Sequence, residues 1–324
     1  MKRICAALLA LAGSQLLSTA PVSAQAWPNK PVRIVNTFAP GGAADFLART
    51  VAENLTTGFG QQFFVESHAG AAGAIGVNLV AVTPPDGYNF VLTNISMLVL
   101  GPISNPKIGY DPYRDLTNLA FLGGSPIVLS VNAKGSIKTL ADFIKEGKTS
   151  AKPLTYSSSG VGSAGHLFGE SLAQKLDIRV EHVPYKGASQ GLMDLVGGHI
   201  VFSAQTVTSS AGQLRGGTLR GIAVTSKERI QDFSDMPTFV ELGHPDLVTS
   251  IWFSLSAPAR LPDDIAQKVN KEISKIMTRI DIREKMREQG MITEAMTPAE
   301  LKTLIDIEHV RWKPVLEQAG LIQK

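Results

Sequence analysis

Cysteine is almost missing from this 324-residue chain, and its one copy lies in a segment expected to be removed. Cys5 stands in MKRICAALLALAGSQLLSTAPVSAQA, where two basic residues precede an apolar stretch and small residues follow. This order predicts a secretory signal peptide, residues 1–24, with cleavage after Ala24 or Ala26. The mature chain would then hold no cysteine, which excludes disulfide frameworks, thiolate catalysis and cysteine metal sites.

Long apolar runs and strong net charge are lacking too. The apolar part of the signal is shorter than the about 20 residues that a membrane helix needs, and no later run is longer, so a membrane anchor is disfavoured. The formal charge is +3, and it falls to +1 once the two basic residues of the signal leave. Near-neutral balance gives no electrostatic footprint for nucleic acid. We expect an exported protein, in the style of a bacterial periplasm.

Metal-ligand spacing is also missing, because the six histidines are scattered. We therefore expect no metal and no cofactor. Glycine, in contrast, is plentiful, and Gly160, Gly162 and Gly165 fit G-x-G-x-x-G within YSSSGVGSAGHLFGE. An extended run precedes this stretch and a helical pattern follows it, the context of a dinucleotide loop. The first amides of a helix bind any small anion, however, so a carboxylate site and a ligand-free turn are the alternatives. Exported proteins meet little NAD, which favours a carboxylate.

Strand-like and helix-like segments alternate along the chain. Leu47, Val51 and Leu55 recur at helical spacing after a Pro-Gly-Gly turn, and residues 78–87, NLVAVTPPDG, resemble a second helix that ends in a Pro-Asp-Gly turn. The alternation predicts an α/β fold with a mainly parallel sheet. The expected strands are 32–38, 63–66, 88–93, 154–159, 179–185, 199–205 and 219–226.

Two further extended runs, 121–132 and 250–258, are interpreted as crossings between two lobes. They predict a hinge with the ligand between the lobes. We place lobe 1 at residues 25–126, lobe 2 at 127–247, and the return to lobe 1 with C-terminal helices at 248–324.

Helix signals are clearest at capping boxes and at the C-terminus. Thr139 with Asp142, and Thr297 with Glu300, have the spacing of a cap and its partner three residues later. Apolar residues at helical spacing near the C-terminus predict core-facing stripes. One stripe is Ile265, Val269, Ile273, Ile276 and Ile280, and the other is Leu301, Leu304, Ile305 and Trp312.

Several motifs, taken in order, carry a family resemblance from Trp27 nearly to the C-terminus. They are WPNKPVRIVNTFAPGGAADFLAR, GAAGAIG, PPDGYNFVLTN, YDPYRDL, TYSSSGVGSAGHLFGE, HVPYKGASQGLMDLVGGHI, LRGIAVTSKERIQDFSDMPTFVELG and IWFSLSAPARLPDDIAQKVN. The chain resembles the Bug family, the TctC-like periplasmic solute-binding proteins of tripartite tricarboxylate transporters. The resemblance implies a type II-like two-lobed binding protein. Such a protein would capture a small organic acid, perform no chemistry, and deliver its ligand to a permease with one large and one small subunit. We expect a monomer.

The resemblance also assigns ligand-binding positions, and no catalytic residue or metal ligand. From lobe 1 it implies a loop around a carboxylate and the end of the third strand. From lobe 2 it implies the glycine-rich loop and two neighbouring strand ends. The positions are Phe38, Ala39, Pro40, Gly41, Gly42, Ala43, Asp45, Thr93, Asn94, Ser158, Gly160, Gly162, Ser163, His166, Tyr185, Lys186, Ala204 and Gln205.

Several of these residues have two interpretations. Asp45 either orients the loop amides or reaches the ligand through water or an amine. Lys186 is either a partner for a carboxylate or a surface lysine, whereas Tyr185 has an apolar body and a polar tip suited to a lining role. His166 either caps a helix or contacts the ligand. Ser163 does not fit a nucleophile elbow, because Val161 stands where that motif has glycine.

Two departures from the family pattern bear on the ligand. Residues 202–206, FSAQT, lack the aspartate that many members carry there, which argues against amino acids. Ser67-His68-Ala69 replaces a commoner Asn-Arg-Pro. Without a cluster of arginines, the ligand expected is a mono- or dicarboxylate, aromatic acids such as terephthalate included, rather than citrate. The alternatives are a periplasmic ligand sensor and an exported NAD-dependent oxidoreductase.

Overall fold

The computed structural model describes residues 27–318 and 320–322, so the expected signal peptide lies outside the described residues. Strands and helices alternate along most of the chain, as predicted. The strands are β1 Val32–Asn36, β2 Phe63–Ser67, β3 Asn89–Asn94, β4 Leu116–Asn132, β5 Leu154–Ser158, β6 Val180–Pro184, β7 Phe202–Thr206, β8 Leu219–Val224 and β9 Ser250–Pro258. The longer helices are α1 Ala43–Phe59, α2 Ala74–Ala81, α4 Leu140–Thr149, α5 Ala164–Leu176, α6 Ala188–Gly197, α7 Val207–Arg215, α8 Asp263–Thr278, α9 Ile280–Glu288 and α10 Pro298–Gln318.

Short helical turns fill the remaining connections. They are η1 Ala71–Gly73, η2 Ser96–Leu100, α3 Gly101–Ser104, η3 Gln231–Phe233 and η4 Pro245–Leu247.

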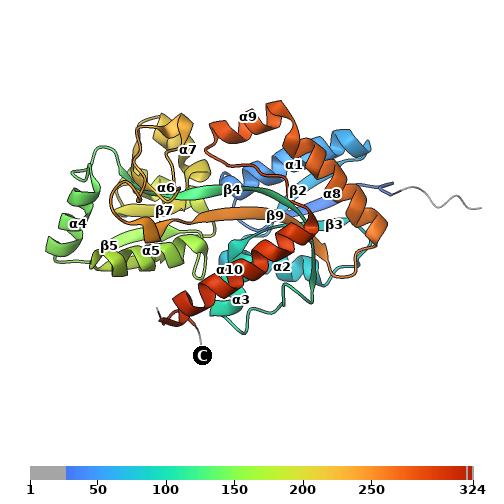
Figure 1. Ribbon diagram of the computed structural model, residues 1–324, viewed down its shortest axis with the longest axis horizontal. Helices are drawn as coiled ribbons and strands as arrows, with labels where there is room; N and C mark the ends of the chain where they lie inside the picture. The colour runs from blue at the N-terminus through green and yellow to red at the C-terminus, as the bar shows by residue number, and fades with distance from the viewer. Residues whose placement is uncertain (1–26, 319, 323–324) are drawn as a thin grey trace, which may run out of the picture.

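The strands of the described residues join in one curled sheet of order β2-β1-β3-β9-β4-β7-β5-β6, and β8 pairs with β4 as well. β1 is parallel to β2 and β3, and β5 is parallel to β6 and β7. The long strands β4 and β9 add antiparallel pairs in the middle. We call β1–β3 with their helices lobe 1, and β5–β8 with theirs lobe 2. Figure 1 shows β4 and β9 running between the two groups of helices.

The crossing β4 is longer than the predicted run, which began at residue 121. It starts at Leu116, because its first residues pair with the end of β9 in lobe 1. Its partner changes from β9 to β7 between Pro126 and Ile127. This change of partner supports a boundary near residue 126, and the lobes 25–126, 127–247 and 248–324 stay our proposal.

The capping signals in the sequence are confirmed. At the start of α4, the Thr139 hydroxyl accepts from the Asp142 amide at 3.1 Å while the Asp142 carboxylate accepts from the Thr139 amide at 2.9 Å. The same reciprocal pair joins Thr297 and Glu300 before α10. Caps are decided by neighbouring residues, which is why sequence alone predicts them.

The C-terminal helices pack on lobe 1 with one exception to the predicted stripes. Ile265, Val269, Ile273 and Ile276 are buried on α8, but Ile280 is 76% exposed. The prediction for Ile280 was wrong because α8 ends at Thr278 and the chain turns into α9, which breaks the period. In α10, Leu301 and Ile305 are buried, whereas Leu304 and Trp312 are half-buried. Within residues 27–318 and 320–322, no helix has the length and apolar character that crossing a bilayer requires.

Candidate functional site

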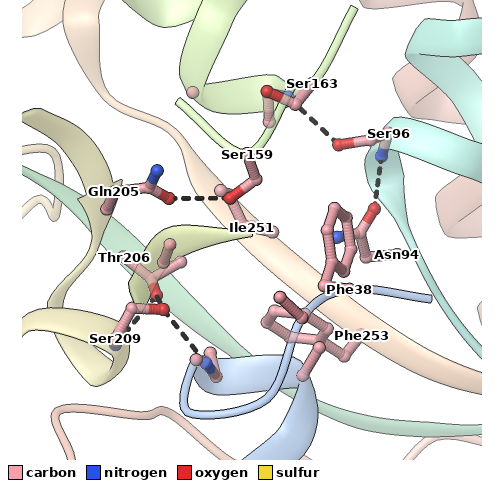
Figure 2. A pocket seen from close by; sticks show the side chains of 17 residues that line it. Phe38, Asn94, Ser96, Ser159, Ser163, Gln205, Thr206, Ser209, Ile251 and Phe253 are labelled. Atoms are coloured by element: carbon pink, nitrogen blue, oxygen red, sulfur yellow. Dashed lines mark hydrogen bonds between the residues drawn. The ribbon is translucent and has the colours of Figure 1, made fainter. Parts of the chain in front are cut away.

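A small cavity lies where the two lobes meet beside the crossing strands. Its volume is about 30 Å³. Lobe 1 and lobe 2 both supply its walls, and β9 supplies the floor (Figure 2). The lining residues are Phe38, Ala39, Gly42, Ala43, Ala44, Asn94, Ser96, Ser159, Ser163, Ala164, Gly165, Ala188, Gln205, Thr206, Ser209, Ile251 and Phe253.

Four helices begin at this cavity. The first residues of α1, α5 and α6 line it, as does Thr206, the residue that caps α7. The N-caps of α1 and α6 are Gly42 and Gly187, which provide no side-chain cap. The first amides of a helix lack partners inside the helix, and they carry partial positive charge. No lining residue in the described chain is formally charged. The cavity is therefore a neutral group of donors suited to an anion.

Two of these helix starts are capped from the opposite lobe. The Ala43 amide of α1 donates to the Ser209 hydroxyl of lobe 2 at 3.0 Å. The Ala164 amide of α5 donates to the Ser96 hydroxyl of lobe 1, also at 3.0 Å. Figure 2 shows both bonds crossing the cavity. These amides therefore point into the space between the lobes.

Further bonds join the lobes at the rim. The Ala39 amide donates to the Lys186 carbonyl at 3.0 Å, and the Ser189 hydroxyl donates to the Pro40 carbonyl at 2.8 Å. The lobes are thus in direct contact, and the structure is a closed conformation.

The cavity walls differ in character. Phe38, Ile251 and Phe253 form an apolar side, and all three side chains are buried. Hydroxyl and amide side chains face them, as Figure 2 shows. Such a combination suits a ligand with an apolar body and polar ends.

Gln205 is the most informative polar lining residue. Its side chain is only 3% exposed, and its amide oxygen accepts from the Ser159 hydroxyl at 2.9 Å. Its Nε2 is buried and has no hydrogen-bond partner. A buried unpaired donor costs free energy unless something satisfies it. Since the oxygen is fixed by Ser159, Nε2 is left as an unpaired donor on a residue that lines the cavity.

Asp45 serves the loop of lobe 1. Its carboxylate accepts from the Gly41 amide at 3.1 Å and pairs with Arg49 at 3.0 Å. Gly41 has a φ of +91°, a conformation that glycine adopts without strain. These contacts agree with the interpretation that Asp45 orients the amides of the loop.

The glycine loop, residues 158–165, makes the tight turn before a helix that its G-x-G-x-x-G pattern predicts. Gly160 and Gly162 have φ of +123° and +81°. A Cβ on Gly165 would lie 2.3 Å from the Ala204 carbonyl oxygen, so this glycine lets α5 pack closely on β7. Ser163 caps α5 by accepting from the His166 amide at 3.3 Å. At about 30 Å³, the cavity beside the loop holds neither a dinucleotide nor an organic acid while the lobes are closed.

Ser158 and His182 have the distance of a nucleophile and a base, with Oγ and Nε2 2.6 Å apart. Ser158 is fully buried, however, and its Oγ also accepts from the Gly160 amide and the Ser163 hydroxyl. A buried hydroxyl with these partners holds the loop and offers no open face to a substrate. Across the described residues, no group of three or more His, Cys, Asp or Glu could hold a metal ion.

Seven of the predicted site residues line the cavity: Phe38, Ala39, Gly42, Ala43, Asn94, Ser163 and Gln205. Asn94 also accepts from the Ser96 amide at 2.8 Å, which orients the start of η2. The others lie outside the lining: Pro40, Gly41, Asp45, Thr93, Ser158, Gly160, Gly162, His166, Tyr185, Lys186 and Ala204.

Tertiary contacts explain three of these positions. The Thr93 hydroxyl turns into the sheet toward Ser254 and Ser256, each 2.8 Å away. The Tyr185 hydroxyl donates to Asp194 on α6. Lys186 has an exposed side chain, and its carbonyl makes the rim contact with Ala39.

Sequence analysis did not single out several lining residues, among them Ser96, Ala188, Ser209, Ile251 and Phe253. Ser209 follows Thr206 at the spacing of a helix cap, and Ser96 follows Asn94 at the spacing of an Asx turn, so both had a local signal. Ile251 and Phe253 lie within the predicted crossing, where alternation alone does not say which face meets the cavity.

Known proteins resemble this chain in sequence and in fold. The tripartite tricarboxylate transporter family receptor, TctC, matches residues 47–321. Protein BugT of Bordetella pertussis is 31% identical over 302 residues, 93% of each chain. The structure of R. palustris Rpa4515 with adipate has a TM-score of 0.88 at 31% identity and covers 91% of this chain and 98% of its own. MatC (Rpa3494) from Rhodopseudomonas palustris with bound malate has a TM-score of 0.85 at 26% identity, covering 89% and 99%. With this fold and these relatives, the chain belongs to the TctC family of tripartite tricarboxylate transporter receptors, as its resemblance to Bug proteins implied.

Proposed function

We propose that this protein is a periplasmic receptor that captures a small organic carboxylate between its lobes and delivers it to a tripartite membrane transporter. The observation that carries the proposal is the neutral cavity at which four helices begin. Hydrogen bonds to a charged group contribute about 1.5–3 kcal/mol each. Several amides can therefore hold a carboxylate with no cationic side chain in the wall.

The bonds between the lobes suggest how the acid would be held. Ser96 and Ser209 place hydroxyl oxygens on the amides of Ala164 and Ala43. Carboxylate oxygens are stronger acceptors than hydroxyls, so an entering acid would take over these amides. Its second polar end would meet the free Nε2 of Gln205.

The ligand class follows from the walls and the relatives. The apolar side of Phe38, Ile251 and Phe253 suits a carbon chain or ring. Relatives with adipate and malate are known. We propose a mono- or dicarboxylate, aromatic acids such as terephthalate included. Citrate is disfavoured because three charges would face a wall without cations, and amino acids are disfavoured because Gln205 presents a donor to their ammonium group.

Capture requires the lobes to move. A water molecule needs about 10–15 Å³ of such space, so a cavity of about 30 Å³ has room for roughly two waters. Entry of an acid would separate the lobes about β4 and β9 and break the hydrogen bonds that join them at the cavity. Closure around the acid would then present one shape to the permease, for which we propose one large and one small subunit. Export would depend on the signal peptide 1–24, and the receptor would act as a monomer.

Thermal unfolding against a panel of ligands tests the proposal. The mature chain is heated with adipate, malate, succinate, terephthalate, benzoate, citrate, glutamate and NAD, and hits are measured by calorimetric titration. An acid at 100 times its dissociation constant stabilises the fold by about 2.7 kcal/mol, a visible shift. We expect one or two carboxylates to bind at one site per chain without being converted. Stabilisation by NAD alone would instead identify the glycine loop as a nucleotide site.

A matched pair of variants locates the binding. Ser159→Ala removes the hydroxyl that fixes Gln205 inside the cavity. Ser226→Ala removes a hydroxyl that bonds to a carbonyl at the exposed surface of lobe 2. We expect only Ser159→Ala to weaken binding of the acid. Equal effects would mean that the acid does not bind in this cavity.

A further inference from the structure

Two histidines stack behind the glycine loop, and neither lines the cavity. The ring centroids of His166 and His182 are 4.1 Å apart with an interplanar angle of 32°. His166 stands in the first turn of α5, and His182 stands on β6. Both rings are half-buried. Sequence reasoning treated His166 alone as a cap or a ligand contact, and the structure places it against a partner.

Each ring holds the loop through one nitrogen. The Gly162 amide donates to Nδ1 of His166 at 3.2 Å, so that nitrogen must be unprotonated. Nε2 of His182 lies 2.6 Å from the Ser158 hydroxyl. Ser158 in turn accepts from Ser163, which lines the cavity and caps α5. A short chain of hydrogen bonds thus joins His182 to Ser163, and the next residue, Ala164, carries one of the amides proposed to hold the acid.

The surroundings keep both rings neutral. Burial, and after it the neighbouring His166, lowers the pKa of His182 to about 3. Burial also lowers the pKa of His166, against a smaller opposing effect of the Glu170 carboxylate. Two titratable groups face the pair. Tyr156 on β5 has its ring 5.0 Å from His182, and Glu170 on α5 accepts from the Tyr156 hydroxyl at 2.8 Å.

We propose that His166 and His182 are positioning residues for the glycine loop, and that the closed, acid-bound conformation requires both rings to be neutral. The inference rests on the proposed function. Protonation of His166 at Nδ1 would replace an acceptor by a donor facing the Gly162 amide. Two stacked imidazolium rings would also repel each other at this distance. Acidification therefore opens the loop and releases the acid.

The direction of the linkage follows from proton uptake. Protons bind more readily to the open form, in which the rings are relaxed toward an ordinary imidazole pKa of about 6.5. If one proton is taken up when the acid is released, the affinity for the acid falls about tenfold for each pH unit below this pKa. Between pH 7.5 and 5.5 we expect a loss of affinity of about tenfold.

Calorimetric titration with adipate and with malate at pH 5.5, 6.5 and 7.5 tests the inference on the mature chain. His166→Asn keeps an acceptor near the Nδ1 position, and His182→Gln keeps a polar group near Nε2, yet neither variant side chain titrates. Each variant is compared with its own affinity at pH 7.5, because the substituted residues position the loop. The double variant His166→Asn/His182→Gln should lose less than about threefold at pH 5.5, since neither ring is left to take up the proton. Protonation of the acids themselves affects all chains equally, so the comparison is made at each pH.

His199→Asn is the control, because His199 is exposed at the end of α6 in the same lobe. It should keep the full pH dependence. An equal loss in all chains, or tighter binding at low pH, would overturn the positioning role and leave the proposed function standing. If no acid binds at any pH, the proposed function fails and the inference fails with it.

Discussion

The two lobes approach the same cavity with different means. Lobe 1 presents a glycine turn and the start of α1, where Gly42 offers no side-chain cap. Lobe 2 presents the starts of α5 and α7, which Ser163 and Thr206 cap with their own hydroxyls, and the start of α6, where Gly187 likewise offers no side-chain cap. Lobe 1 thus contributes one helix start, Phe38 and the side chains of Asn94 and Ser96, whereas lobe 2 contributes three helix starts, most of the hydroxyls and the Gln205 amide.

This difference indicates where ligand choice is made. Backbone amides bind any carboxylate, so lobe 1 provides general recognition of an anion. Side chains can change without moving the chain, so lobe 2 can distinguish one acid from another. Ser96 and Ser209 join these roles, since each lobe caps a helix of the other.

The largest effect should come from adding charge to the selective lobe. Gln205→Glu would put a carboxylate in a wall without cations and remove the free donor. Like charges placed together cost several kcal/mol. We expect the affinity for the acid to fall about 100-fold, or about 2.7 kcal/mol, in calorimetric titration. Gln174→Glu, on the exposed side of α5, adds the same charge to the same lobe and should leave affinity nearly unchanged. Similar losses in both variants would remove Gln205 from the site.

The next effect concerns the close packing of the glycine loop. Gly165→Ala would force a Cβ to 2.3 Å from the Ala204 carbonyl oxygen. Overpacking of this kind costs about 1–3 kcal/mol, and the start of α5 would shift with it. Denaturant unfolding should show the loss. Gly212→Ala is the matched control, because its Cβ meets nothing within 4 Å, and it should stabilise α7 by up to about 1 kcal/mol. An unchanged free energy of unfolding in Gly165→Ala would mean that α5 does not depend on this contact.

Removing the exchanged caps tests the link between the lobes. Ser96→Ala and Ser209→Ala each delete one bond across the cavity, worth about 1 kcal/mol. The ligand-free chain should open, with a larger radius of gyration in small-angle scattering, and the double variant should open further. Unchanged scattering curves would show that the remaining rim contacts suffice for closure.

A further effect is the pH dependence of stability carried by lobe 2. The pKa of His182 is about 3 in the folded chain and near 6.5 in the unfolded chain, so the unfolded chain takes up this proton first as the pH falls. The contribution of His182 to the free energy of unfolding is therefore complete above pH 6.5 and decreases as the pH falls toward the folded pKa. The melting temperature should therefore drop between pH 7 and 5, and less so in His182→Gln. An identical drop in the variant would assign the acid sensitivity to other groups.

Local signals in the sequence determined much of this protein. The crossing 250–258 coincides with β9, and both capping boxes form as predicted, because periodicity and caps depend on neighbouring residues. The glycine pattern correctly located a turn before a helix, and the family motifs located seven lining residues.

Only the tertiary structure decided which groups meet. Ala43 and Ser209 lie 166 positions apart, and the stacked His166 and His182 come from a helix and a strand. The Tyr185 hydroxyl donates to Asp194 on α6 and does not line the cavity. Ile280 lies beyond the end of α8, so it does not continue the apolar stripe of that helix. Such pairings depend on the register of the strands and on the closure of the lobes. Residue types and spacing along the chain do not contain that information, since it arises from the packing of distant segments.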